Sequence, residues 1–169
     1  MSPQSIDPGL FSPDVLEFLR QLNNHGVHFM IVGGEAVIFY GHIRLTGDVD
    51  VFFDRSPGNA ARLFEALQEY WQGVIPGLDD PSQLEDSGVV FQFGIPPNRI
   101  DLLNDIDGVS FDDAWPRRTE VMIGDGADRI PLSYIGLDDL IVNKRVSGRP
   151  KDLDDLPFLI DASRSVETD

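Results

Sequence analysis

The sequence predicts an α+β fold in which helices pack on a small mixed β-sheet. Apolar residues recur at helical spacing near both ends of the chain. Between them lie short apolar runs rich in β-branched and aromatic residues, the pattern of buried strands. Glycine and proline separate these segments, and there is no internal repeat or low-complexity tract. Segments of both kinds along one chain favour a sheet covered by helices.

The first half of the chain contains five predicted elements. Ser12 and Pro13 supply an N-cap and a proline at the first helical position, so a helix begins there and ends near Asn24. Residues 28–32 are apolar and rich enough in β-formers for a buried strand. A short helix over 35–40, a strand over 48–53 and a helix over 59–71 follow.

The second half continues the alternation of strands and helices after an acidic, loop-like segment over 76–88. Two strands are expected at 89–93 and 99–103, separated by prolines that forbid a ladder through the connection. The remaining expected elements are a strand pair at 120–123 and 129–132, and helices at 137–147 and 152–162.

The length and composition predict one domain. The chain has 169 residues and no cysteine, and a chain of this size buries about 70% of its unfolded surface without disulfides or metals as staples. We expect a single domain over 1–169, with a core at about 28–132 and C-terminal helices at about 137–162. The lack of cysteine excludes disulfide frameworks, thiolate zinc sites and cysteine nucleophiles. No apolar run is long enough to span a membrane and no signal-peptide pattern is present, so a cytoplasmic location is expected.

The charge is strongly negative. There are 13 Lys and Arg residues against 29 Asp and Glu residues, a net charge of −16. This balance opposes non-specific binding to nucleic acid and suits a hard cation such as Mg²⁺. The only dense basic stretch contains Lys144, Arg145, Arg149 and Lys151. It is the natural place for a phosphate group, although ion pairs with nearby aspartates are an equal alternative.

Asp48 and Asp50 lie two residues apart in a predicted strand. Because side chains alternate across a strand, both carboxylates project from one face, with their Cα atoms about 6.5–7 Å apart. Two such carboxylates favour a divalent cation between them. The alternative is a pair of solvated aspartates at the start of a strand.

A glycine pair and a third carboxylate strengthen the metal hypothesis. Gly33 and Gly34 follow the preceding predicted strand and allow close approach of a phosphate to the backbone, or simply form a tight turn. Asp101 lies among apolar residues in another predicted strand, where a carboxylate needs solvent or a cation. Together with Asp48 and Asp50 it makes a candidate site for metal-assisted phosphoryl transfer.

The ordered set of these motifs resembles the DNA-polymerase-β-type nucleotidyltransferase superfamily. Within it, the sequence is most similar to the minimal bacterial nucleotidyltransferases, including the AbiEii-like toxins of abortive-infection and toxin–antitoxin systems. The resemblance covers about residues 28–159. The motifs that carry it are Gly33-Gly34, Arg44-Leu-Thr-Gly-Asp48-Val-Asp50, Arg99-Ile-Asp101, Leu140-Ile-Val-Asn-Lys144 and Gly148-Arg-Pro-Lys151-Asp152-Leu-Asp-Asp155.

The resemblance implies a role for each matching residue. It implies that Gly33 and Gly34 hold a nucleoside triphosphate, and that Asp48 and Asp50 bind Mg²⁺ or Mn²⁺. Asp101 is implied as the third metal ligand, able to activate an acceptor hydroxyl. The residues implied to contact phosphate are Lys144, Arg149 and Lys151, with an orienting role for Asp152. This sequence has Gly34 where many members have serine, which leaves only backbone donors in the turn.

Arg44 and Thr46 precede the acidic pair, and either contact the nucleotide or acceptor or cap the start of the strand. The three histidines do not fall at metal-ligand spacing, so we expect structural or surface roles for them. Neither a Gly-x-Ser-x-Gly element nor a Gly-Lys-Ser/Thr phosphate loop is present, which removes the common hydrolase and P-loop interpretations.

The leading hypothesis is a magnesium-dependent nucleotidyltransferase that moves a nucleoside monophosphate from a nucleoside triphosphate to a hydroxyl. The resemblance implies a bacterial defence or toxin–antitoxin setting, with a possible cognate partner protein. The acceptor is an RNA such as a tRNA end, a protein side chain, or a small molecule such as an aminoglycoside or lincosamide. One alternative is a non-catalytic nucleotide-binding or partner-binding module with the same fold. A second is a structural acidic domain whose Asp-x-Asp is accidental.

Overall fold

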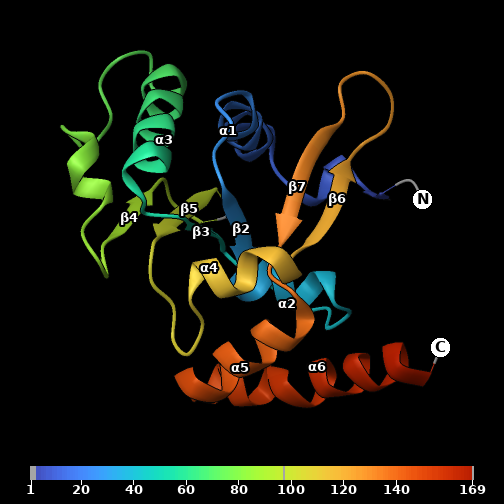
Figure 1. The fold of residues 1–169 in the computed structure, drawn as a ribbon. Helices are drawn as coiled ribbons and strands as arrows, with labels where there is room; N and C mark the ends of the chain where they lie inside the picture. The colour runs from blue at the N-terminus through green and yellow to red at the C-terminus, as the bar shows by residue number, and fades with distance from the viewer. Residues whose placement is uncertain (1–2, 97, 169) are drawn as a thin grey trace.

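The computed structural model describes residues 3–96 and 98–168. Their fold is α+β, as the sequence predicts: a mixed sheet with helices on it (Figure 1). Among these residues no helix combines the length and the apolar character needed to cross a lipid bilayer.

The sheet has seven strands within the described residues, in the order β1-β6-β7-β2-β3-β5-β4. Strands that are consecutive in the sequence form three antiparallel pairs, β2–β3, β4–β5 and β6–β7. Parallel pairs β2–β7 and β3–β5 join these into one sheet, and β1 pairs in parallel with β6 at its edge. The strands are β1 (Gln4–Ile6), β2 (Phe29–Val32), β3 (Asp48–Phe53), β4 (Val90–Phe93), β5 (Arg99–Leu103), β6 (Thr119–Ile123) and β7 (Ile130–Tyr134).

The helices fall into two groups at opposite ends of the sheet (Figure 1). Helix α1 packs beside α3, and α5 packs beside α6, with the short α2 between the sheet and the second pair. The α-helices are α1 (Pro13–Asn24), α2 (Gly33–Phe39), α3 (Pro57–Tyr70), α4 (Phe111–Ala114), α5 (Leu137–Ser147) and α6 (Pro150–Thr168). Short 3-10 turns occupy η1 (Pro8–Leu10), η2 (Pro81–Leu84) and η3 (Trp115–Arg117).

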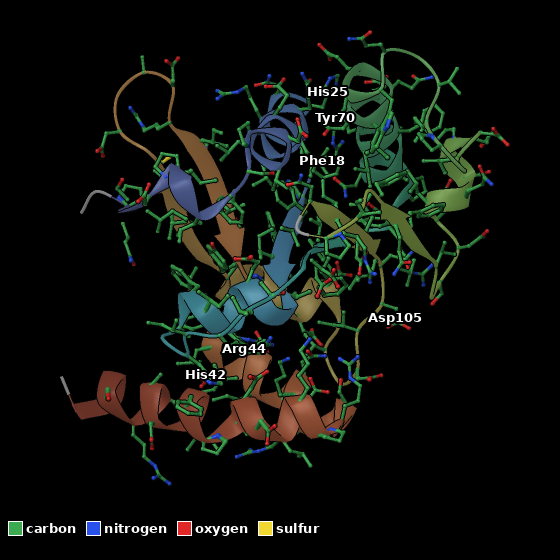
Figure 2. All side chains as sticks on the ribbon, turned by 180° about the vertical axis from the view of Figure 1, so that it is seen from behind. Phe18, His25, His42, Arg44, Tyr70 and Asp105 are labelled. Atoms are coloured by element: carbon green, nitrogen blue, oxygen red, sulfur yellow. The ribbon has the colours of Figure 1, made fainter. Side chains whose placement is uncertain are left out.

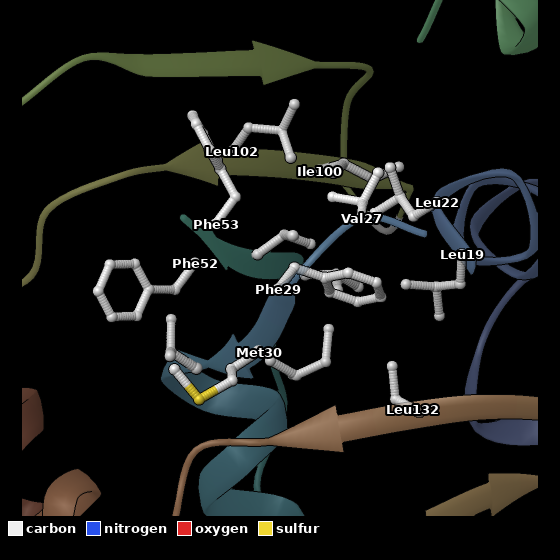
Figure 3. Close-up of a cluster of buried hydrophobic side chains, with 14 of the residues drawn as sticks. Leu19, Leu22, Val27, Phe29, Met30, Phe52, Phe53, Ile100, Leu102 and Leu132 are labelled. Carbon is white, nitrogen blue, oxygen red and sulfur yellow. The ribbon is translucent and has the colours of Figure 1, made fainter. Parts of the chain in front are cut away.

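Much of the hydrophobic core lies between the sheet and the α1–α3 pair, and the buried cluster continues to α2, α5 and α6. Leu19 of α1 points toward Phe29 of β2, with Leu132 of β7 below them, and Leu22 lies beside Val27 and Ile100 (Figure 3). Leu102 of β5 is fully buried in the same cluster. Burial of these large side chains stabilises the fold by about 1.5–3 kcal/mol for each side chain removed from water.

Local sequence signals explain where several elements begin and end. The Ser12 hydroxyl accepts a hydrogen bond from the Val15 amide at 3.3 Å, which confirms the predicted N-cap of α1. Helix α5 ends at Gly148 in the left-handed conformation, with φ of 61°. Helix α6 continues past the predicted end at residue 162 and contains Pro157 in its interior.

One strand and one α-helix were not predicted from the sequence, and neither were the short 3-10 turns. Strand β1 has three residues, Gln4–Ile6, and is too short and too polar to show an apolar alternation. It pairs in parallel with β6. Helix α4 has four residues and begins at Ser110, whose hydroxyl accepts from the Asp113 amide. The glycine pair was placed before a helix starting at residue 35, whereas Gly33 and Gly34 form the first turn of α2 itself.

Candidate active site

Three carboxylates meet on one face of the sheet, at the junction of β3 and β5. These strands are parallel neighbours, and their register places Asp48 opposite Arg99 and Asp50 opposite Asp101. Residues two apart in a strand share a face, so all four side chains project to the same side. Carboxylate oxygens of Asp48, Asp50 and Asp101 lie within 4.8 Å of one another.

The electrostatics of this cluster favour a cation. Burial raises the pKa of Asp50 to about 6, and the negative charges of Asp101 and Asp48 add to the rise. Each of the three carboxylates offers hard oxygen donors, the ligand type that Mg²⁺ and Mn²⁺ take. The residues therefore fit a divalent metal ion.

Position 33 requires glycine, both because of its backbone conformation and because of the nearby Asp50 side chain. Its φ is +66°, in the left-handed region that favours glycine. Val32 pairs with Asp50 across β2 and β3, which brings the Asp50 side chain directly against the backbone of Gly33. A Cβ atom on Gly33 would overlap a carboxylate oxygen of Asp50.

Gly34 is buried and equally constrained by its surroundings. A Cβ atom there would lie 2.8 Å from the Thr46 hydroxyl oxygen and 3.3 Å from a terminal nitrogen of Arg44. The Thr46 hydroxyl donates to the backbone oxygen of Asp48 at 3.2 Å. Thr46 therefore makes the contact expected of a residue that caps the start of the strand, one of its two predicted roles.

Helices α5 and α6 supply a buried ionic network. The Lys144 ammonium lies 3.0 Å from Asp152 Oδ1 and 3.2 Å from Asp155 Oδ2, and only 4% of the Lys144 side chain is exposed. Arg44 donates two hydrogen bonds to the Asp155 carboxylate, at 2.9 and 3.1 Å. His42 Nδ1 also lies 3.2 Å from Asp155 Oδ1. The network therefore fixes the segment before β3 against the last two helices.

The three basic residues predicted to contact phosphate differ in their surroundings. Lys144 is enclosed by carboxylates, as described above. Arg149 pairs with Asp152 through Nε at 2.8 Å, while most of its side chain stays exposed. Lys151 is exposed and, within the part of the chain that the structure describes, makes no ion pair with a carboxylate. Lys151 lines the same pocket as the three carboxylates, and its positive charge partly offsets the rise in the pKa of Asp50.

A pocket of about 510 Å³ joins the acidic cluster, the glycine turn and the helical wall. Figure 2 shows Arg44 between the sheet and α6, and Asp105 on the segment that follows β5. The predicted site residues that line the pocket are Gly33, Gly34, Arg44, Asp48, Asp50, Asp101, Lys144, Arg149 and Lys151, together with Asp152. Thr46 is not among the residues that line it.

Two of the pocket residues that were not predicted as site residues lie beside Asp101. Arg99 bridges Asp48, at 3.2 Å, and Asp101, at 3.1 Å. Its position two residues before Asp101 indicated the shared face, but its pairing with Asp48 depends on the parallel β3–β5 register. Gln92 lies opposite Asp101 on β4 and lines the same pocket. Only the order of the strands reveals it.

The pocket brings together an Asp-x-Asp pair, a third carboxylate on the neighbouring strand, a glycine turn and basic side chains, the motifs on which the sequence resemblance to nucleotidyltransferases rests. The family model described as "Nucleotidyltransferase of unknown function (DUF6036)" matches residues 13–159. The chain therefore belongs to this family of nucleotidyltransferases. A search of curated proteins found no match to the chain.

Proposed function

We propose that the pocket binds a nucleoside triphosphate with Mg²⁺ or Mn²⁺ and transfers its nucleoside monophosphate to an acceptor hydroxyl. The observation that carries the proposal is the convergence of Asp48, Asp50 and Asp101, within 4.8 Å, in a pocket that also holds a glycine turn and basic side chains. Phosphoryl transfer depends mainly on positioning and on neutralising charge, so a small site of this kind is sufficient.

The proposed reaction divides its tasks among the three carboxylates. Asp48, Asp50 and Asp101 would hold the metal ion, which would supply positive charge to neutralise the α-phosphate and the leaving pyrophosphate. Asp101 accepts the proton of the attacking hydroxyl. The acceptor oxygen then forms a bond to the α-phosphorus while the bond to the bridging oxygen breaks and pyrophosphate leaves.

The proposed phosphate contacts come from opposite sides of the pocket. Gly33 and Gly34 admit the triphosphate to the backbone, with Arg44 beside them. Arg149 and Lys151 lie on the helical wall, where Lys151 has its charge available for a phosphate. We assign Lys144 a positioning role, because its buried ammonium is already paired with two carboxylates.

We further propose a setting, and we keep three classes of acceptor for the test. The sequence pattern is similar to AbiEii-like toxins, which supports a bacterial toxin–antitoxin or defence setting with a cognate partner protein. A nucleoside triphosphate substrate is consistent with a cytoplasmic location. The net charge of −16 disfavours a large RNA as acceptor. The acceptors to be tested are nevertheless a tRNA end, a protein side chain and a small hydroxylated molecule.

One observation favours a second candidate, a non-catalytic module with the same fold. Arg99 already neutralises part of the acidic cluster by pairing with Asp48 and Asp101. Such a module would bind a nucleotide or a partner without turning it over.

A labelling experiment separates the two candidates. The protein is incubated with Mg²⁺ and each of the four nucleoside triphosphates, labelled at the α-phosphorus, together with tRNA, cell protein or an aminoglycoside. Transfer predicts label on one acceptor class, release of pyrophosphate, no label from γ-labelled nucleotide, and loss of all signal in Asp50→Asn. Nucleotide binding without labelling of any acceptor would support the non-catalytic module.

A further inference from the structure

Arg99 pairs directly with the acidic cluster. Its guanidinium lies between two of the three carboxylates, with Nη2 3.2 Å from Asp48 Oδ2 and Nε 3.1 Å from Asp101 Oδ1. A second hydrogen bond, from Nη2 to Asp101 Oδ2 at 3.2 Å, makes the contact with Asp101 bidentate. Arg99 therefore takes oxygen atoms that a metal ion would also need.

The side chain of Arg99 is partly exposed at the edge of the pocket. It is the first residue of β5, and 32% of its side chain is exposed, against 9% for Asp101. The guanidinium lines the pocket rather than the core. The guanidinium is a single positive charge on a flexible side chain, whereas a divalent ion brings two charges to the same carboxylates. The ion therefore has the stronger attraction at equal distance.

We propose that Arg99 is an exchangeable counter-cation. Without metal it neutralises Asp48 and Asp101 and keeps the carboxylates together; when a divalent ion binds, Arg99 yields these oxygens and turns to the phosphates of the nucleotide. The proposal rests on the metal-dependent nucleotide site proposed above. It adds a residue that opposes binding of the metal alone and favours binding of the metal with its nucleotide.

This dual role predicts effects of opposite sign. Removing the guanidinium frees two carboxylates from a competing charge, so the affinity for the metal alone rises. The same change removes a donor to phosphate, so the affinity for the metal–nucleotide complex falls. A residue that only supported the fold would lower both affinities together.

The test compares wild type with Arg99→Gln and Arg99→Lys. Mn²⁺ binding is followed by electron paramagnetic resonance, which reports the free ion, and binding of a non-hydrolysable triphosphate in saturating Mg²⁺ is measured by calorimetry. We expect about tenfold tighter Mn²⁺ binding and about tenfold weaker nucleotide binding in Arg99→Gln. Arg99→Lys keeps the charge but loses the bidentate contact, so both of its affinities should lie between those of wild type and those of Arg99→Gln. Arg149→Gln is the matched control: it removes a charge from the same pocket but not from the three carboxylates, so its Mn²⁺ affinity should change less.

Each outcome is decisive. Equal or weaker Mn²⁺ binding by Arg99→Gln, with wild-type binding intact, overturns the role of Arg99 and leaves the metal site standing. Tighter Mn²⁺ binding without weaker nucleotide binding also contradicts the proposal, because the second role is then missing. Failure of wild type and both variants to bind Mn²⁺ contradicts the proposed function itself. If Arg99→Gln does not fold, Arg99→Lys alone must show the same two changes in smaller degree.

Discussion

The carboxylate of Asp50 fills the space that a side chain at Gly33 would need. The two residues belong to different elements, α2 and β3, and meet because Val32 pairs with Asp50 across the sheet. The absence of a side chain at Gly33 therefore leaves room for the Asp50 carboxylate in the acidic cluster. The acidic cluster requires Gly33 and Asp50 together.

We predict that Gly33→Ala disrupts the acidic cluster. The new methyl group must displace the Asp50 carboxylate and must hold a φ near +66°, so the free energy of unfolding should fall by more than about 2 kcal/mol. Urea unfolding and Mn²⁺ binding measure the two effects. Gly26→Ala is the matched control, because Gly26 has φ of 67° and its nearest neighbour would lie 3.9 Å from the new atom. Similar losses in both variants would show that strain alone explains the result.

We predict that the metal-free protein loses stability as the pH rises from about 4 to about 6. The pKa of Asp50 is about 6 in the folded protein and near 4 when unfolded, so the folded state holds the extra proton throughout this window. The difference corresponds to about 3 kcal/mol. Glu35, whose pKa is raised to about 7 by burial and then by the charge of Asp50, extends the loss toward neutral pH.

Urea unfolding across pH 4–8, for wild type and Asp50→Asn, measures this prediction. The variant has no carboxylate at position 50, so its stability should fall less over the window. Saturating Mg²⁺ should restore stability above pH 6 in wild type only. Parallel pH profiles for the two proteins would show that Asp50 is not the group responsible.

We predict that the two lysines of the pocket affect different properties. Lys144→Met leaves Asp152 and Asp155 with one positive partner fewer in a buried setting, so the free energy of unfolding should fall by about 3–5 kcal/mol. Lys151→Met removes an exposed charge, so stability should change by less than about 0.5 kcal/mol while nucleotide affinity falls about tenfold. Chemical denaturation and calorimetry on the pair test this, and equal effects on stability would refute the distinction.

We predict that position 34 cannot accept serine unless Thr46 is reduced in size. A Cβ atom on Gly34 lies 2.8 Å from the Thr46 hydroxyl oxygen and 3.1 Å from its Cβ. Gly34→Ser should therefore destabilise the protein by about 1–3 kcal/mol, and Thr46→Gly should relieve most of that loss in the double variant. Thermal unfolding of the four proteins gives the coupling energy. Additive losses would mean that the two side chains do not compete for the same space.

Local patterns predicted most of the elements, because Ser12, the proline starts and the apolar periodicity act over a few residues. They also predicted that Asp48 and Asp50 share a face, which follows from the strand alternation alone. The approach of Asp101 was a hypothesis that depended on strand order, and the parallel β3–β5 pairing now places it opposite Asp50. The extent of the domain, over 1–169, stays a prediction.

Long-range pairing decided what the sequence did not reveal. Arg99 bridges two carboxylates because β5 lies beside β3 in one register, and Lys144 is buried because α6 brings Asp152 and Asp155 over it. The sequence alone does not distinguish a basic residue whose charge is neutralised by an ion pair from one whose charge is available for a ligand. For this reason the sequence implied phosphate contact for both Lys144 and Lys151, whereas in the structure Lys144 is buried among carboxylates and Lys151 is exposed.

The central claim is that the three carboxylates bind a nucleoside triphosphate through a divalent metal. Thermal unfolding with each of the four triphosphates, with and without Mg²⁺, tests it most directly on wild type and Asp48→Asn/Asp50→Asn. At a hundredfold excess over the dissociation constant, one nucleotide should raise the Tm of wild type by about 5–10 °C in the presence of Mg²⁺ only. The variant should show no such rise above its own baseline. An equal rise without Mg²⁺, or in the variant, would contradict the claim, as would the absence of a rise with every nucleotide.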